Sequence, residues 1–316
     1  MSHPPYRTYA SYLRERFGCS VYRVAVDAGF SCPNRCEGSR HGSGCTYCTE
    51  DGARAPYLGG EDLDASNAMD SLRRQVRDSL LFLRRRYDAS AFILYFQAYS
   101  NTNAPAEALR RVYDAGLSLA PFVGLNVATR PDCVDADVAD LLASYRTESR
   151  EVWVEVGLQS AHDPTLDRIR RGHSVADFLS AYGLLKGRGL KVAVHLIFGL
   201  PGEHAKEVRK TMDLIADIHP DGVKIHNLHI ARGTELAGEY MRGELTAPCA
   251  GRHREYLIDA IERLPSDIIV MRLTCDTPPD RLLAPRGFGP KERFLSSVTA
   301  EMRRRGAFQG RLSGMP

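Results

Sequence analysis

One short stretch of the chain holds a cluster of cysteines. Residues 31–49 read SCPNRCEGSRHGSGCTYCT and contain half of the eight cysteines of the sequence: Cys32, Cys36, Cys45 and Cys48. Residues 1–18 are polar and rich in arginine and do not read as a secretory signal peptide. Because disulfides persist mainly in oxidising compartments, we expect a cytoplasmic protein whose clustered thiols bind a metal or an iron-sulfur cluster.

Two kinds of metal site are compatible with this loop. Structural zinc usually takes four Cys or His ligands arranged as two close pairs. Cys45 and Cys48 form one such pair, and the wider pair of Cys32 and Cys36, or His41, could complete a zinc site. Alternatively, three thiolates hold a 4Fe-4S cluster and leave the fourth iron open for a substrate or cofactor. The spacing alone does not decide which three cysteines would do so.

Further motifs resemble a known family in order and spacing. They are GFSCPNR at 29–35, YFQAY at 95–99, TRPDC at 129–133, EVGLQS at 155–160, RGH at 171–173 and GLPGE at 199–203. Together with a C-x12-C-x2-C loop they resemble a bacterial radical S-adenosylmethionine (SAM) family related to the Elongator catalytic subunit. The resemblance covers about residues 20–235. It implies that Cys32, Cys45 and Cys48 bind a 4Fe-4S cluster, while Cys36, where an acidic residue is expected, is a spare thiol or an alternative ligand.

The resemblance also assigns residues to SAM. Many family members bind the SAM amino group with a Gly-Gly-Glu turn, which four consecutive residues replace here: Gln97, Ala98, Tyr99 and Ser100. Gln159 and Arg171 are twelve residues apart, similar to a polar SAM-contacting pair in the heme-biosynthetic radical SAM oxidase. Arg171 would pair with the SAM carboxylate, and Gln159 with the ribose or the methionyl part. Without the resemblance, Arg171 reads as a solvated charge in the RIRR run at 168–171.

Polar residues inside predicted strands are further candidates. A buried carboxylate without a partner is costly, so we place Glu155 in a polar cavity with the cofactor. His195 is expected near the SAM ribose, with a hydrogen-bonded core histidine as the alternative, and Ile197 would pack on the adenine. The last predicted strand carries three residues that contact substrate or serve the fold, with the first two on one face: Lys224, His226 and His229.

Strands and helices alternate along the chain. Six segments read as strands: 21–28, 91–97, 121–128, 151–158, 190–198 and 222–229. Amphipathic helical patterns with caps separate them, which predicts a parallel sheet with right-handed crossovers. We expect an α/β fold, a partial six-stranded (β/α) barrel of the radical SAM type, with the candidate residues at the carboxyl ends of the strands. The expected domains are an extension at 1–20, the barrel core at 21–235 and a closing extension at 236–316.

Composition bounds the partners. The chain has 316 residues, a net charge of +3 and a mean hydropathy of -0.30, and no apolar run approaches the ~20 residues that span a membrane. Positive charge is concentrated at 286–311. Residues 291–305 read as a closing helix whose Phe294, Val298 and Met302 face the barrel. Its arginines, with nearby phenylalanines, form a candidate RNA-binding surface over the barrel mouth.

Three functions remain open at this stage. The first is a radical SAM enzyme that cleaves SAM at a 4Fe-4S cluster to a 5'-deoxyadenosyl radical, for modification of the wobble uridine of tRNA. The second is a radical SAM enzyme that acts on a small metabolite, and the third is a non-catalytic metal-binding module. The first implies tRNA and an electron donor such as flavodoxin or ferredoxin as partners, and no membrane. The remaining cysteines are scattered, which argues against an auxiliary cluster.

Overall fold

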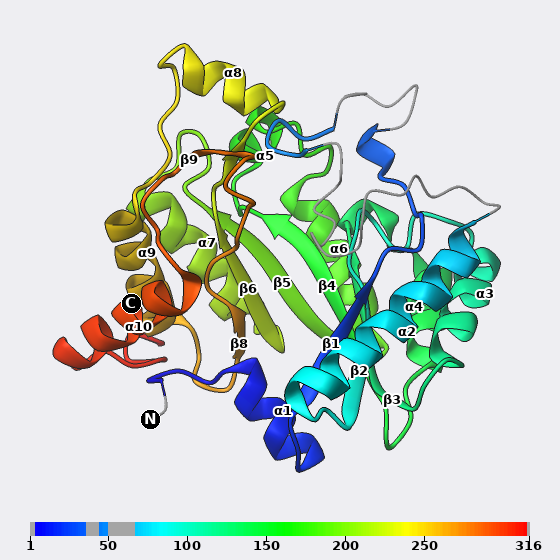
Figure 1. Ribbon diagram of the computed structural model, residues 1–316. Coiled ribbons are helices and arrows are strands. Elements are labelled where there is room, and N and C mark those ends of the chain that lie inside the picture. Colours follow the sequence, from blue (N-terminus) through cyan, green and yellow to red (C-terminus); the bar gives the residue numbers. More distant parts are fainter. Residues whose placement is uncertain (1–3, 36–43, 50–66, 315–316) are drawn as a thin grey trace.

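A curled sheet of seven parallel strands forms the centre of the computed structural model, which describes residues 4–35, 44–49 and 67–314 (Figure 1). The strands pair in the order β1-β2-β3-β4-β5-β6-β8, so each strand lies beside the next along the sheet and the sheet forms a half-barrel. Their bounds are β1 Val21–Val26, β2 Ala91–Phe96, β3 Phe122–Thr129, β4 Glu151–Gln159, β5 Lys191–Phe198, β6 Gly222–Asn227 and β8 Ile269–Arg272. The predicted fold class is confirmed.

The strands form here because their sequences are apolar and rich in β-branched and aromatic residues. β2 reads AFILYF and is buried along its whole length, as expected for a parallel strand covered on both faces. Side chains from neighbouring strands and from the surrounding helices join in one continuous core, which includes Leu94, Val127, Val154 and Val194. The six predicted strands are all present, and β8 adds a seventh that was not predicted.

Helices follow the strands and cover the outside of the sheet. The helices are α1 Tyr9–Phe17, α2 Ala68–Tyr87, α3 Ala106–Leu117, α4 Ala136–Ser144, α5 Asp163–Arg168, α6 Val175–Gly187, α7 Ala205–Ile218, α8 Glu235–Met241, α9 Ala250–Arg263 and α10 Lys291–Arg304. Asp135 caps α4, since its carboxylate accepts a bond from the Val138 amide at 2.8 Å. In the described parts of the chain, no helix is both long and apolar enough to cross a membrane.

The amino-terminal helix closes one end of the half-barrel. Tyr9 and Tyr12 of α1 pack edge-on against Trp153 of β4, with ring centroids 5.5 and 5.7 Å apart. The Tyr12 hydroxyl donates to the Glu151 carboxylate at 2.6 Å, and Arg16 pairs with the same group at 3.1 Å. Through these contacts α1 docks on the end of the sheet. The opposite end, where the strands terminate, is therefore the one that carries the candidate residues.

The carboxy-terminal segment packs on the far edge of the sheet. As predicted, Phe294, Val298 and Met302 are the buried residues of α10. A short antiparallel pair of β7 (Ile230–Ala231) and β9 (Leu282–Ala284) lies apart from the main sheet. Beyond α10, the Gln309 amide donates to the carbonyl of Pro5 at 3.0 Å. The end of α10 thus lies beside the amino-terminal extension, away from the cluster loop (Figure 1). The domain boundaries at 20 and 235 stay a prediction.

Candidate functional site

The cysteine loop begins at the carboxyl end of β1. Cys32 precedes a short 3-10 helix, η1 (Pro33–Arg35), whose Arg35 amide donates to the Cys32 carbonyl at 2.9 Å. Cys45 and Cys48 lie in one turn, closed by a bond from the Cys48 amide to the Cys45 carbonyl at 2.9 Å. Cys45 is buried, and the other two thiols are partly exposed. Cys36 and His41, the two other ligands considered, lie outside the described residues.

The three thiols lie close enough to affect one another. Burial and the negative charges of Cys45 and Cys32 together raise the pKa of Cys48 to about 11, against the effect of Arg35 and Arg171. Across residues 4–35, 44–49 and 67–314, no three His, Cys, Asp or Glu side chains are placed to hold a single metal ion. A 4Fe-4S cluster binds each cysteine to a different iron, so its ligands surround a larger group.

Cys45 has the most strongly positive surroundings of the site. Arg171 points Nη1 at its sulfur at 3.7 Å, and Asn34 points Nδ2 at it at 3.4 Å. Burial alone would raise the pKa of Cys45, but the charges of Arg171 and Arg130 lower it below the usual cysteine value. These groups favour the thiolate form, which is the form that binds iron. The donor set around Cys45 therefore fits a metal ligand.

The RGH motif at 171–173 ties this thiol to the end of β4. Arg171 Nη2 donates to the Gly157 carbonyl at 3.0 Å, and His173 Nε2 contacts the same oxygen at 3.1 Å. Gly172 has φ +76°, and a Cβ there would lie 2.7 Å from Oδ1 of Asn34. Position 172 needs a glycine because its backbone is left-handed and because a Cβ there would collide with the cysteine loop.

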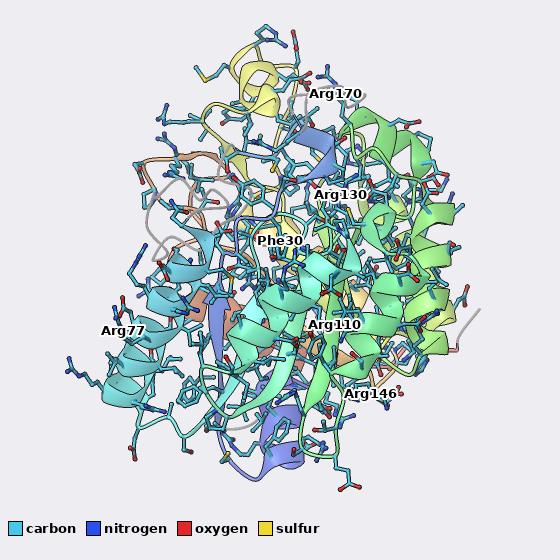
Figure 2. All side chains as sticks on the ribbon, turned by 90° about the vertical axis from the view of Figure 1, so that its right-hand side faces the viewer. Phe30, Arg77, Arg110, Arg130, Arg146 and Arg170 are labelled. Carbon is cyan, nitrogen blue, oxygen red and sulfur yellow. The ribbon has the colours of Figure 1, made fainter. Side chains whose placement is uncertain are left out.

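Arg130 holds Arg171 in place. Its Nη2 donates to the Arg171 carbonyl at 2.7 Å, while Asp132 binds its guanidinium through both oxygens, at 2.8 and 2.9 Å. Figure 2 shows Arg130 and Arg170 toward the upper end of the molecule, and Arg110 and Arg146 on the helical layer below. The TRPDC motif does not by itself predict a role for Arg130. Its function as a backbone anchor depends on a contact across 41 residues, which no local pattern reveals.

Gln159 ends β4 in an uncommon backbone conformation. Its φ is +74°, in the left-handed region, and its Oε1 is buried without a hydrogen-bond partner among the described residues. Nε of Arg171 is in the same state. A Cβ added to Gly157 would lie 2.6 Å from both the Arg171 Nη2 and the Gln159 Nε2. Backbone strain and unsatisfied polar atoms persist mainly at functional sites, so this pair fits a polar ligand such as SAM.

The segment that was expected to replace the Gly-Gly-Glu turn follows β2. Gln97 and Tyr99 are partly exposed, and Tyr99 has φ +58°. Ala98 and Ser100 are buried, and the Ser100 hydroxyl contacts Thr129 Oγ1 at 3.1 Å and accepts from the Arg130 amide at 3.3 Å. Of the four side chains, only Gln97 and Tyr99 are therefore accessible to a ligand. Ile197, which is 7% exposed, packs with Leu166, Leu200 and other apolar residues beside the site.

Glu155 lies deeper in the half-barrel and is paired. Its Oε2 accepts bonds from Lys224 Nζ at 2.6 Å and from the Tyr95 hydroxyl at 2.7 Å. Burial would raise the pKa of Glu155, but the positive charges of Lys224 and Arg23 lower it to about 2. Burial lowers the pKa of Lys224 to about 8 although Glu155 opposes the change. This pairing accounts for the burial of the carboxylate, and the contact of Glu155 with the cofactor stays a prediction.

Two of the histidines lie in the same interior. The rings of His195 and His226 are 4.1 Å apart at an angle of 67°, and Arg272 of β8 contacts His226 Nε2 at 3.2 Å. His229 lies beyond the end of β6, where its Nδ1 contacts Thr277 at 2.6 Å and the Cys275 sulfur at 3.6 Å. Lys224 and His226 therefore share the inner face as predicted, and His229 belongs to a separate turn.

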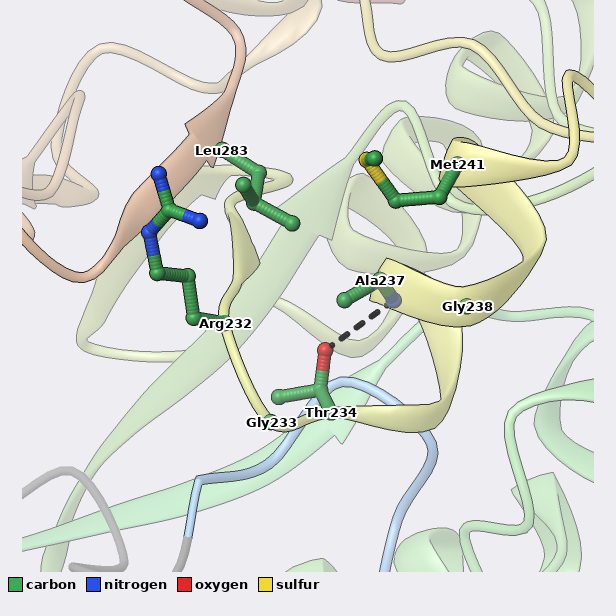
Figure 3. A pocket seen from close by; sticks show the side chains of 7 residues that line it. All are labelled: Arg232, Gly233, Thr234, Ala237, Gly238, Met241 and Leu283. Carbon is green, nitrogen blue, oxygen red and sulfur yellow. Dashed lines mark hydrogen bonds between the residues drawn. The ribbon is translucent and has the colours of Figure 1, made fainter.

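A pocket of about 380 Å³ lies elsewhere, between α8 and β9 (Figure 3). Its lining consists of Arg232, Gly233, Thr234, Ala237, Gly238, Met241 and Leu283. None of the candidate site residues contributes to it. Thr234 uses its hydroxyl to cap α8, accepting from the Ala237 amide at 3.2 Å. We therefore assign this pocket no part in the site.

Comparison with known families gives two matches. The Radical SAM superfamily model matches residues 32–215, which include all the proposed ligands and SAM contacts. The Radical_SAM C-terminal domain model matches residues 220–304.

Known relatives match over different lengths. The chain is similar to the uncharacterized Bacillus subtilis protein YtqA, at 36% identity over 306 residues that cover 97% of this chain and 92% of YtqA. A tRNA uridine(34) acetyltransferase from Methanocaldococcus infernus is 40% identical over 126 residues, which cover 39% of this chain but only 23% of that enzyme. The structure of Elp3 from Methanocaldococcus infernus, lacking its first 46 residues, has a TM-score of 0.68 at 21% identity. That match covers 92% of this chain and 64% of the Elp3 chain, and it shows a shared fold.

Proposed function

Because the chain belongs to the radical SAM superfamily, we propose that Cys32, Cys45 and Cys48 bind its 4Fe-4S cluster and that the enzyme modifies the wobble uridine of tRNA. The chain is a radical SAM enzyme, and its cofactors are the cluster and SAM. One observation carries the assignment of the ligands. The thiol of Cys45 lies in a buried, positively charged setting and in one turn with Cys48, whose pKa is raised in part by the charge of Cys32.

Each residue near the thiols would have a distinct task. When bound, the cluster and SAM supply a one-electron reductive cleavage of SAM. Arg171 would pair with the SAM carboxylate through the donor that has no partner, and Gln159 would bond to the ribose or methionyl part. Ile197 offers an apolar surface to the adenine. Glu155 and Lys224 form an ion pair at 2.6 Å, which matches their charges inside the half-barrel.

The substrate proposal has its own support. The segment shared with the Methanocaldococcus infernus tRNA uridine(34) acetyltransferase is 40% identical, although it spans only 23% of that enzyme. We infer that this chain modifies the same nucleotide. A comparison of tRNA nucleosides from cells with and without the gene tests this inference. A change confined to uridine 34 supports it, and identical profiles would favour the small-metabolite reaction.

Anaerobic reconstitution tests the cluster and the cleavage. The wild-type protein should bind about four irons per chain and release 5'-deoxyadenosine from SAM in the presence of a reductant. Cys32→Ala, Cys45→Ala and Cys48→Ala should each lose the cluster, because each removes one of three ligands. Cys36→Ala, and Cys133→Ala as a nearby control, should retain it. A protein that takes up zinc alone and cleaves no SAM would refute the proposal.

A further inference from the structure

A row of polar side chains crosses the interior of the half-barrel below the proposed SAM site. In a parallel sheet, residues in register on neighbouring strands point to the same face. His195 of β5 is in register with Lys224 of β6, and Lys224 is in register with Arg272 of β8. His195 is also in register with Gly157, whose carbonyl binds Arg171. The row therefore starts directly beside the residues assigned to SAM.

The charges of this row do not balance. Lys224 is matched by Glu155 at 2.6 Å, and Arg23 lies 3.6 Å from the other oxygen of the same carboxylate. Arg272 forms no ion pair with any acidic side chain in the described ranges, and its Nη1 contacts Nε2 of His226 at 3.2 Å. A cation held inside a protein without an anion is unfavourable. Arg272 is therefore the group of this interior with the most to gain from an anion.

The imidazole rings of His195 and His226 carry no charge that would balance Arg272 or repel an anion. Burial lowers the pKa of His195 and of His226 well below the usual histidine value, and the nearby cations lower both further. Both rings are therefore neutral at pH 7. Nε2 of His195 is buried without a hydrogen-bond partner among the described residues. A neutral imidazole can donate one hydrogen bond to an oxygen, so these rings are suited to flank an anion.

Among the described residues, buried side chains close this row on the side of α1. His195, His226 and Arg272 all keep partial exposure, although protein surrounds the two rings. One layer below, Trp153 and Ala193 are almost fully buried beneath α1. The accessible side of the row therefore faces the site of SAM cleavage, which is where a substrate must lie to react.

We propose that Arg272, with His226, His195 and Lys224 around it, forms a subsite for a carboxylate or phosphate group of the substrate. The guanidinium binds such oxyanions through two parallel N–H bonds. This subsite rests on the proposed function, because it would hold the substrate in a fixed position beside the cleaved SAM. It needs no part of the cysteine loop, so it can be tested whether or not the cluster is present.

Calorimetric titration with two small anions tests the subsite. Wild-type protein at low ionic strength is titrated with inorganic phosphate and, separately, with acetate, before and after saturation with SAM. We expect one site for at least one of the two anions, and the better ligand identifies the group. Arg272→Gln should weaken that binding at least tenfold. Arg209→Gln, a control at an exposed arginine paired with Asp259, should leave it unchanged.

Further measurements separate a binding role from a structural one. His226→Gln should also weaken anion binding, by several-fold, which keeps the test usable if Arg272→Gln does not fold. Cluster content and SAM affinity should be the same in both variants as in the wild type. The proposal is overturned if neither anion binds, if Arg272→Gln binds as tightly as the wild type, or if SAM displaces the anion. Failure of cluster assembly with intact anion binding would instead count against the proposed function.

Discussion

At the scale of single residues, Gly157 lets Arg171 and Gln159 meet. Its Cβ position is 2.6 Å from a nitrogen of each, so an alanine there must displace both side chains. We predict that Gly157→Ala weakens SAM binding ten- to a hundredfold, because the loss of a charge-assisted hydrogen bond costs ~1.5–3 kcal/mol. SAM affinity is measured by titration of the reconstituted protein, together with its iron content.

The control for this change is another glycine in a regular element. A Cβ at Gly183 of α6 meets no atom within 4 Å, so Gly183→Ala should leave SAM affinity and iron content unchanged. Gly157→Ala keeps all three cysteines, and its iron content shows whether the displaced Arg171, which contacts the Cys45 sulfur, is needed for the cluster as well as for SAM. Equal SAM affinity in the two variants would show that Arg171 and Gln159 do not bind SAM.

The Glu155 and Lys224 pair permits a double-mutant cycle. Glu155→Leu alone leaves the ammonium of Lys224 buried without its carboxylate, and we predict a loss of ~3–5 kcal/mol in unfolding free energy. Lys224→Met alone should cost a similar amount. The double variant should lose clearly less than the sum, as measured by urea unfolding. Additive losses would mean that the two charges are not coupled.

The same pair makes a prediction about acid stability. The pKa of Glu155 falls from 4.5 to about 2 on folding, so its ionised form stabilises the protein above pH 4.5. This contribution is lost as the pH falls through the folded pKa, because both states then bind the proton. The unfolding free energy of wild-type protein should therefore decrease more between pH 5 and pH 3 than that of the double variant. Parallel curves for the two proteins would contradict the shift.

At the scale of elements, six strands of the main sheet could be predicted from the sequence, and the seventh, β8, could not. β2 and β5 are long runs of apolar and β-branched residues between turns, and such runs fit only buried strands. β8 has four residues, IVMR, and is paired with β6 through a register shift. A segment that short carries too little periodicity to be distinguished from a loop. β8 forms because the edge of β6 offers unpaired backbone groups, and the sequence of β8 alone does not show that this edge is available.

The candidate site divides in the same way. The cysteines and Arg171 can be predicted from the sequence, because they lie in short motifs with characteristic spacing. The anchoring of Arg171 by Arg130, and the pairing of Glu155 with Lys224, join positions 41 and 69 residues apart. Such pairs arise from strand register, which becomes known only when the sheet is assembled. The placement of Glu155 was therefore the least predictable part of the site.

The packing of α1 on Trp153 predicts how much the closed end of the half-barrel contributes to stability. Trp153 is fully buried between Tyr9 and Tyr12, so Trp153→Ala should cost ~3–5 kcal/mol of unfolding free energy. Phe82→Ala, at a ring that is 60% exposed on α2, should change it by less than ~0.5 kcal/mol. Trp153 is the only tryptophan of the chain, so circular dichroism must follow the unfolding of this variant. A small loss in Trp153→Ala would mean that α1 does not close the barrel.

At the scale of the whole molecule, the arginines at the end of α10 do not lie over the barrel mouth, where the sequence predicted an RNA-binding surface. Arg304 pairs with Glu301 at 2.7 Å, and Arg305 pairs with Glu255 and Glu301 at 2.7 and 2.6 Å. The nearby aromatic rings are used in packing, since Phe294 stacks on His253 at 5.8 Å. The end of α10 also lies beside the amino-terminal extension and away from the barrel mouth. The α10 helix therefore does not lie over the barrel mouth, and RNA binding by the basic segment at 286–311 stays a prediction.

A second arginine triple offers a matched comparison. Arg84, Arg85 and Arg86 also end a helix, α2, and all three are exposed. They form no ion pair with an acid in the described part of the chain. Because polyanion binding depends on cations that are free to neutralise phosphates, unpaired arginines contribute more to it than paired ones. If tRNA is the substrate, the two triples should therefore differ in their effect on its binding.

We predict that replacing Arg84, Arg85 and Arg86 together by Ser weakens tRNA binding and reduces its dependence on salt concentration, because up to three phosphate contacts are lost. The same replacement of Arg303, Arg304 and Arg305 should leave both quantities near the wild-type values. Binding is measured with unmodified tRNA over a series of salt concentrations, and cleavage of SAM without tRNA serves as the control for an intact site. A larger loss in the 303–305 variant would restore the carboxy-terminal surface as the RNA contact. Absence of tRNA binding at low salt in the wild type would favour the small-metabolite reaction.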